Sequence, residues 1–133
     1  MSDSYISQEL RRLVAARASR RCEYCLIHES DTFMGCQVDH ILSEKHGGQT
    51  TADNLAYACT FCNRSKGSDI ATLDDHGQLT RLFHPRLDRW TDHFVFQEAC
   101  IQSLTNVGFG TARLLGFNTE ERIEERLAMT KPL

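Results

Sequence analysis

The spacing of apolar residues near the start of the chain predicts an amphipathic helix over residues 6 to about 20. Apolar side chains recur there at helical intervals, at Ile6, Leu10, Leu13, Val14 and Ala18. Ser7 is the expected N-cap, and Glu9 follows in the first turn, where a negative charge is favourable. This segment therefore has one face suited to packing against a core.

The middle of the chain has shorter apolar runs. Residues 35–42 alternate loosely and end in an apolar run, which predicts a strand or one arm of a hairpin. Residues 43–51 include Gly47-Gly48 and read as a loop. Asp53 predicts the N-cap of a short helix over residues 54–58, and a second helical turn is expected from about Phe61 to Gly67.

The pattern after Gly67 predicts two hairpins followed by two helices. A turn at residues 74–77 joins short strands, the second over residues 79–83, and residues 94–96 and 100–104 predict another hairpin. Trp90 is expected to anchor this part to the core. Helices are predicted over about 107–115 and 119–129, the second with Asn118 as N-cap.

These elements define an α+β protein, expected to be a single domain over residues 1–133. It comprises an N-terminal helix, a core over about 21–68, and a C-terminal extension over about 69–133. No apolar run approaches the roughly 18 residues that a membrane span needs. The start, Met1-Ser2-Asp3-Ser4, lacks the basic and apolar regions of a secretory signal. We therefore expect a cytoplasmic protein with no membrane partner.

The charge distribution leaves room for a nucleic-acid partner. The net charge of −3 argues weakly against one as an average over the chain. The first 21 residues nevertheless carry a local excess of arginine, at Arg11, Arg12, Arg17, Arg20 and Arg21. These side chains either contact phosphate or form a solvated helix face, and the sequence alone does not choose between the two.

Four of the six cysteines form two Cys-x-x-Cys pairs, Cys22/Cys25 and Cys59/Cys62. Four thiolates at this spacing suit a closed tetrahedral zinc site of the structural kind, whereas redox activity is a remote alternative. The remaining Cys36 and Cys100 are expected to be small buried hydrophobes.

A second group of polar residues lies between the two cysteine pairs and just after the second pair. Asp39 and Asn63 offer hard oxygen ligands that suit Mg²⁺ or Mn²⁺, completed by waters and a substrate phosphate. His40 is a candidate general base, because histidine is the side chain that ordinarily exchanges protons near neutral pH. Because neighbouring strand residues point to opposite faces, Asp39 and His40 can share one site only at a strand end or a distortion.

These residues together resemble the HNH family of ββα-metal endonucleases, in the subgroup with a four-cysteine zinc site. The series Cys22-x-x-Cys25, Val38-Asp39-His40-Ile41, Gly47-Gly48, Asn54-Leu55 and Cys59-x-x-Cys62-Asn63-x-x-Lys66-Gly67 carries the resemblance over about a third of the chain.

The resemblance implies two antiparallel strands and a helix around one divalent ion, and hydrolysis of DNA, expected to be double-stranded. The resemblance also implies that His40 is the general base and that Asp39 and Asn63 hold the ion. It implies that Asn54 orders the loop and orients His40. Many members have histidine where this chain has Asn63. The main alternative is a zinc-stabilised module that binds nucleic acid or protein without catalysis.

Three further residues are candidate substrate contacts. Lys66 and Arg64 are placed to meet a neighbouring phosphate, or else they are solvated charges at a helix end. His46 lies in the loop after the general base, where it either touches substrate or faces water.

Overall fold

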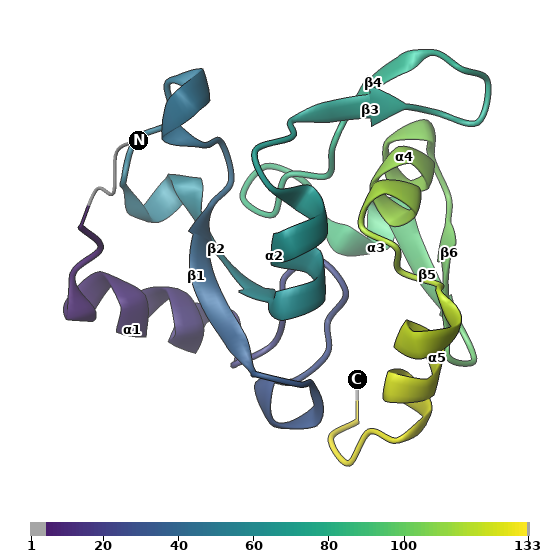
Figure 1. The fold of residues 1–133 in the computed structure, drawn as a ribbon, viewed down its shortest axis with the longest axis horizontal. Coiled ribbons are helices and arrows are strands. Elements are labelled where there is room, and N and C mark those ends of the chain that lie inside the picture. Colours follow the sequence, from purple (N-terminus) through teal and green to yellow (C-terminus); the bar gives the residue numbers. More distant parts are fainter. Residues whose placement is uncertain (1–4, 133) are drawn as a thin grey trace.

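The computed structural model describes residues 5–132, so residues 1–4, on which the expectation of no export signal depends, lie outside the described range. In chain order the helices and strands are α1 (Gln8–Arg17), β1 (Cys36–His40), β2 (Leu55–Cys59), α2 (Thr60–Lys66), β3 (Ala71–Leu73), β4 (Leu79–Arg81), α3 (Trp90–His93), β5 (Phe94–Gln97), β6 (Cys100–Ser103), α4 (Asn106–Leu114) and α5 (Glu120–Leu127) (Figure 1). The α+β class is confirmed. Within residues 5–132, no helix has both the length and the apolarity needed to cross a membrane.

The centre of the molecule is a ββα unit made of β1, β2 and α2. The two strands are antiparallel, with Cys36 opposite Cys59 and His40 opposite Leu55. Helix α2 follows β2 without a connecting loop, so Cys59 is both the last residue of the strand and the N-cap of the helix. This direct junction fixes α2 against the hairpin (Figure 1).

Strand β2 corrects the short helix predicted over residues 54–58. Every residue of β2 is buried, because both faces of the strand are covered. Leu55 and Tyr57 pack with α1, whereas Ala56 and Ala58 belong to the main core. An uninterrupted apolar run of this length does not distinguish a buried strand from a helix, and pairing with β1 outweighs the N-cap signal of Asp53.

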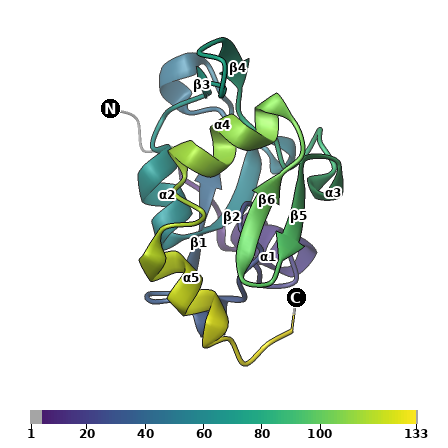
Figure 2. The same cartoon turned by 90° about the vertical axis from the view of Figure 1, so that its right-hand side faces the viewer.

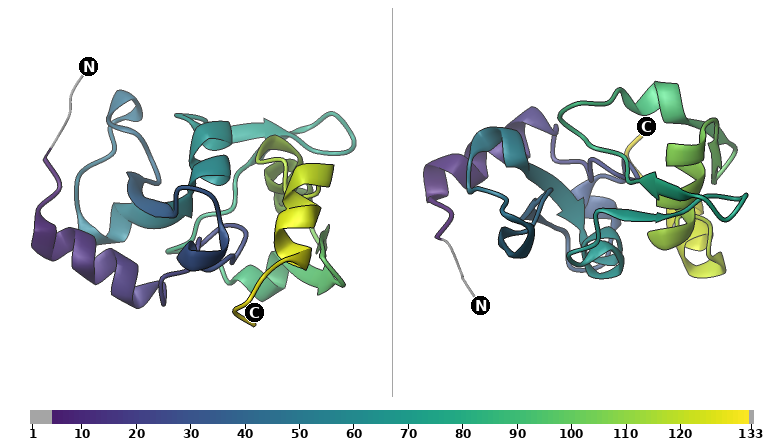
Figure 3. Two further views of the ribbon diagram at one scale, coloured as in Figure 1. Left: turned by 60° about the horizontal axis from the view of Figure 1, so that its bottom comes forward. Right: turned by 90° about the horizontal axis from the view of Figure 1, so that it is seen from above.

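Helix α1 covers the outer side of the β1–β2 hairpin, away from the C-terminal elements (Figure 3). The side chain of Ser7 caps it by accepting a hydrogen bond from the amide of Leu10, as predicted. Val14 is fully buried, whereas Leu13 is exposed on the other face. The helix ends earlier than predicted, because Ser19 and Arg20 adopt left-handed backbone conformations.

The C-terminal extension confirms the two predicted hairpins, β3–β4 and β5–β6, and the helix that follows them. Trp90 anchors it: the indole donates to the carbonyl of Tyr24 at 2.8 Å and stacks on Phe96. Helix α4 packs closely on the β3–β4 hairpin, where a side chain at Gly110 would collide with the methyl groups of two threonines. The extension is thus packed onto the core at several points.

Helix α5 lies beside α2, at the end of the ββα unit where the cysteines are (Figures 1 and 2). Its N-cap is Thr119, which accepts from the amide of Arg122, and not Asn118 as predicted. Asn118 instead forms two hydrogen bonds, each 2.8 Å long, with the backbone of Ile101 in β6. A capping residue and its neighbour are easily exchanged in a prediction when both have capping side chains.

Candidate active site and metal centre

The loop between β1 and β2 is held in shape by Asn54. Its Oδ1 accepts from the amide of Leu42 at 2.9 Å, and its Nδ2 donates to the carbonyls of Leu42 at 2.9 Å and Gln49 at 2.8 Å. Gly48 passes so close that a Cβ there would lie 1.8 Å from the carbonyl oxygen of Leu42. Only glycine fits this crossing, which explains the second glycine of the Gly47-Gly48 pair.

An open cavity of about 710 Å³ lies between the end of β1 and the C-terminal half of α2. Asp39, His40 and Asn63 all line it, so three of the predicted site residues share one solvent-accessible space. The other lining residues are Ser43, Glu44, Lys45, Gly67 and Ser68. His40 is the last residue of β1, which is the strand end that the sequence analysis required for neighbouring residues to face one site.

His40 is oriented by Thr50, a residue that the sequence analysis did not single out. The ring Nε2 lies 2.8 Å from the Thr50 hydroxyl oxygen. When Nε2 carries the proton and donates to that hydroxyl, Nδ1 keeps the lone pair that a general base needs. Among the residues described, the side chain of Asn54 makes no hydrogen bond to His40; it bonds to Leu42 and Gln49, in the loop that carries Thr50. Adjacent threonines in a loop give no sequence signal for such a role.

Asp39 lies half-buried on the face of β1 that is covered by α2. Burial raises the pKa of its carboxyl group, and the amide of His40 and the ammonium group of Lys66 partly oppose this shift. A carboxylate in such surroundings gains from a nearby cation. The carboxylate of Asp39 and the side-chain amide of Asn63 are both oxygen donors, so the residues present fit a hard divalent ion.

The structure gives Lys66 a different place from the two that the sequence suggested, a phosphate contact or a solvated charge at a helix end. The side chain is only 3% exposed, and Nζ donates to the carbonyl oxygen of Ile41 at 2.7 Å. It therefore ties the end of α2 to the residue after His40, and it is neither a solvated charge nor exposed to a phosphate. Arg64, on the same helix, is exposed, as is His46 in the loop, and neither lines the cavity.

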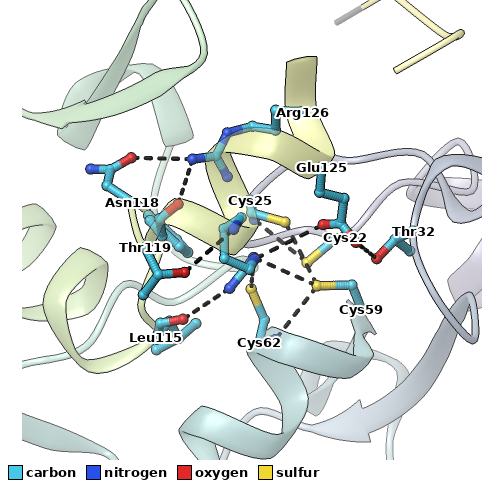
Figure 4. Close-up of polar contacts among 12 residues, drawn as sticks. Cys22, Cys25, Thr32, Cys59, Cys62, Leu115, Asn118, Thr119, Glu125 and Arg126 are labelled. Atoms are coloured by element: carbon cyan, nitrogen blue, oxygen red, sulfur yellow. Dashed lines mark hydrogen bonds and ion pairs between the residues drawn. The ribbon is translucent and has the colours of Figure 1, made fainter. Parts of the chain in front are cut away.

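The four cysteines Cys22, Cys25, Cys59 and Cys62 gather into one buried cluster, with all four sulfur atoms within 4.8 Å of one another (Figure 4). Tetrahedral zinc with Zn–S bonds of about 2.3 Å separates its sulfurs by about 3.8 Å. The Sγ atoms of Cys25 and Cys59 are 3.7 Å apart. The cluster thus matches the size and donor set of a four-thiolate metal site.

We call the two Cys-x-x-Cys segments, residues 22–25 and 59–62, the first and second knuckle. Backbone amides support the cluster in the same way in both knuckles. The amide of Cys25 donates to Sγ of Cys22, and the amide of Cys62 donates to Sγ of Cys59, each over 3.5 Å. Burial raises the pKa of the Cys22 and Cys62 thiols well above the ordinary value. Keeping all four buried cysteines as thiolates would therefore require a cation, which a bound metal ion would supply.

The remaining cysteines lie apart from this cluster. Cys36 is half-buried at the start of β1, and burial raises the pKa of its thiol. Cys100 is exposed at the start of β6, so its predicted burial is wrong. At a strand end next to a tight turn, side-chain exposure follows the hairpin geometry and not the apolar character of the residue.

Arg122 is a second residue that the sequence analysis missed. It comes from α5, yet its guanidinium group reaches the sulfur atoms of Cys62 and Cys59. Burial alone would lower the pKa of Arg122, but the neighbouring thiolates raise it overall. The segment that carries it, Glu-Glu-Arg-Ile-Glu-Glu-Arg, is typical of a solvated helix, so only the fold reveals this contact.

Comparison with known families agrees with this geometry. The sequence model of the family described as HNH endonuclease matches residues 22–69. The matched segment begins at the first cysteine of the cluster, ends just after α2, and includes the cavity residues Asp39, His40 and Asn63. No curated protein and no solved structure matched the chain.

The chain therefore carries an HNH endonuclease motif, built on a ββα unit with a four-cysteine cluster suited to a metal ion. Proteins of this class generally act on nucleic acids. Residues 70–132, including α4 and α5, lie beyond the matched segment.

Proposed function

We propose that this protein is a metal-dependent endonuclease that hydrolyses phosphodiester bonds of DNA. The observation that supports this most is the shared cavity of Asp39, His40 and Asn63 within the HNH segment. A base, two oxygen donors for a cation and open space for a phosphate lie together there. This combination suits attack of water on a phosphodiester.

In the proposed reaction, His40 accepts a proton from the attacking water at Nδ1 while Thr50 holds Nε2. Asp39 and Asn63 would hold Mg²⁺ or Mn²⁺, which when bound neutralises charge on the phosphate and the leaving 3′ oxygen. Lys66 ties the end of α2 to the end of β1, because its Nζ donates to the carbonyl oxygen of Ile41 at 2.7 Å. The chain's contribution is thus to position one base beside one phosphate.

We further propose that the four-cysteine cluster holds Zn²⁺ in a purely structural role. All four donors are thiolates, which leaves no coordination position for water or substrate. Because Asn63 directly follows Cys62, this ion would position a ligand of the catalytic ion. Double-stranded DNA as substrate, and the cytoplasm as location, are parts of the same proposal. Exposed arginines of α1, such as Arg11 and Arg12, offer positive charge for the phosphate backbone.

Nicking of supercoiled plasmid DNA tests this function. With Mg²⁺ or Mn²⁺ present, the wild-type protein should convert supercoiled to open-circular DNA. His40→Ala should slow this conversion at least about 100-fold, because a general base contributes roughly that much or more. Equal cleavage by the two proteins, or no cleavage with any divalent metal, would rule the proposal out.

A binding module without catalysis is the second candidate. Two observations favour it: the net charge of −3, and an asparagine at position 63, where many members of the HNH family have histidine. Retained DNA binding without metal-dependent cleavage would support this alternative. Loss of binding after Arg11→Gln and Arg12→Gln, but not after His40→Ala, would strengthen it further.

A further inference from the structure

The C-terminal helix α5 places a fully buried positive charge against the cysteine cluster. Arg122 is 2% exposed. Its Nη2 atom lies 3.3 Å from Sγ of Cys62 and 3.8 Å from Sγ of Cys59, and its Nη1 donates to the carbonyl of Leu115 at 3.0 Å. Figure 4 shows α5 lying over the four sulfurs, with Leu115 at its side. The guanidinium group thus contacts the cysteine cluster through Nη2 and the backbone through Nη1.

Two further residues, Phe61 and Glu125, contact the guanidinium group, the first on its planar face and the second at its edge. It stacks over the ring of Phe61, a residue of the second knuckle, with 5.0 Å from the guanidinium carbon to the ring centroid. Its Nε faces Glu125 at 4.0 Å, and Glu125 is itself held by the Thr32 hydroxyl at 2.7 Å. Phe61, Glu125 and Leu115 thus contact other parts of the guanidinium group, whereas Nη2 faces the sulfur atoms.

The contact complements the backbone support of the cluster. The knuckle amides reach Cys22 and Cys59, the first cysteine of each pair. The shorter contact of Arg122 is with Cys62, a second cysteine, and this is the ligand that precedes Asn63. A charged donor therefore reaches a sulfur that neither knuckle amide contacts.

Burying an arginine is costly unless a negative charge lies beside it. A Zn²⁺ ion with four thiolate ligands carries a net charge of about −2, which meets that requirement. Glu125 alone is a weak partner, because its Oε1 and the Nε of Arg122 form no hydrogen bond among the residues described. The main charge partner of Arg122 is thus the cluster.

We propose that Arg122 is an outer-shell positioning residue of the metal centre, which donates hydrogen bonds to the metal-bound thiolates of Cys62 and Cys59. Through it, the C-terminal extension becomes part of the metal site, although it lies outside the HNH segment. The inference rests on the proposed four-thiolate metal site, and it does not depend on DNA cleavage. Removing the contact should weaken metal binding and change the electronic character of the metal–sulfur bonds.

The chain offers a closely matched control in Arg126. This arginine is also in α5, one turn further on, and it is 3% exposed. It donates to the carbonyls of Ala99 and Phe117 and to the side chain of Asn118, and makes no hydrogen bond to sulfur among the residues described. Arg122→Gln and Arg126→Gln therefore both remove a buried charge from one helix, but only the first removes a thiolate contact.

The experiment uses the full chain loaded with Co²⁺, whose sulfur-to-metal charge-transfer bands report on the thiolates. For Arg122→Gln we expect these bands to move to lower energy, because sulfur that loses hydrogen bonds is a better donor. We also expect metal affinity, measured by competition with a chelator, to fall about tenfold or more. Arg126→Gln should leave both the band positions and the affinity close to wild type, even if it lowers the unfolding temperature.

Unchanged bands and affinity in folded Arg122→Gln would overturn the proposal, as would equal changes in both variants. Arg122→Lys covers the case in which Arg122→Gln does not fold. It keeps the charge but loses the planar fork, so it should show a smaller shift in the same direction. No shift in Arg122→Lys would likewise count against the proposal. Because DNA is absent, a failure of the nuclease proposal leaves this result interpretable.

Discussion

The Nε2 atom of His40 lies 2.8 Å from the hydroxyl oxygen of Thr50, which belongs to the loop that Asn54 shapes. This bond holds the imidazole ring in place, and when Nε2 carries the proton it leaves Nδ1 free to accept another. Thr50→Val should slow cleavage about tenfold, a part of the 100-fold or more that a general base supplies. Thr50→Ser should keep most of the activity, because it retains the hydroxyl.

Thr51→Val is the matched control for this prediction. The Thr51 hydroxyl donates to Asp53 at 2.6 Å and is not bonded to the imidazole. Its loss should leave the cleavage rate within about twofold of wild type, since it leaves the His40 hydrogen bond intact. Rates are compared under single-turnover conditions, so that product release does not mask the chemical step. A Thr50→Val protein as fast as Thr51→Val would contradict the role given to Thr50.

Asn54 should matter for stability as well as for cleavage. Asn54→Ala removes all three of its side-chain hydrogen bonds, to Leu42 and Gln49, and should lower the free energy of unfolding by about 1–3 kcal/mol. Gly48→Ala should act in the same direction, because its Cβ would lie 1.8 Å from a carbonyl oxygen. Urea unfolding of the metal-loaded protein measures both effects, and Asp53→Ala, at an exposed position, is the control. A change below about 0.5 kcal/mol in Asn54→Ala would refute this role.

Alkylation at pH 8 should separate the cysteines by environment. Burial raises the pKa of the Cys36 thiol above its ordinary value, so its thiolate fraction stays low until the pH nears the raised pKa. Exposed Cys100 should react first with iodoacetamide, Cys36 should react only as the pH is raised, and the four clustered cysteines should stay protected by their metal. Peptide mass spectrometry reads out each site. Early labelling of Cys36 would contradict its buried environment.

Removal of zinc should abolish cleavage even though the zinc takes no part in the reaction. The proposed link is the chain itself, since Cys62, a proposed zinc ligand, is followed directly by Asn63, a proposed ligand of the catalytic ion. A chelator that prefers Zn²⁺ to Mg²⁺, used in excess Mg²⁺, should stop nicking and expose the cysteines to alkylation. Added Zn²⁺ should restore activity. A zinc-free protein that remains folded and active would show that the two sites are independent.

Much of the site could be predicted because its residues come in local groups. The Cys-x-x-Cys pairs bring two ligands together within one turn of chain, and Asp39-His40 and Cys62-Asn63 are neighbours in sequence. Their convergence needed only two strands and a helix in the expected order. The one local error there, a helix in place of β2, arose because a strand buried on both faces has no alternating pattern.

The parts that sequence reasoning missed all depend on contacts over long separations or on the exact path of a loop. Lys66 looks solvated in sequence, but it lies under the end of β1 and bonds to Ile41. Arg122 looks like one charge among several on a polar helix, but it donates a hydrogen bond to the sulfur of Cys62, 60 residues away in sequence. Thr50 reaches His40 only because of a tight loop crossing. Periodicity and capping patterns carry no information on such contacts.

The most direct test of the account is a metal titration of single-turnover DNA cleavage by the wild-type protein and four variants. With Mn²⁺ varied, Asp39→Ala and Asn63→Ala should need more metal to reach half of the maximal rate, because each removes an oxygen ligand. Asn63→His, which supplies another ligand, should recover the wild-type requirement. His40→Ala should lower the maximal rate at least about 100-fold without changing the metal requirement. Full cleavage by His40→Ala, or an unchanged metal requirement in both ligand variants, would contradict the assignment of this site.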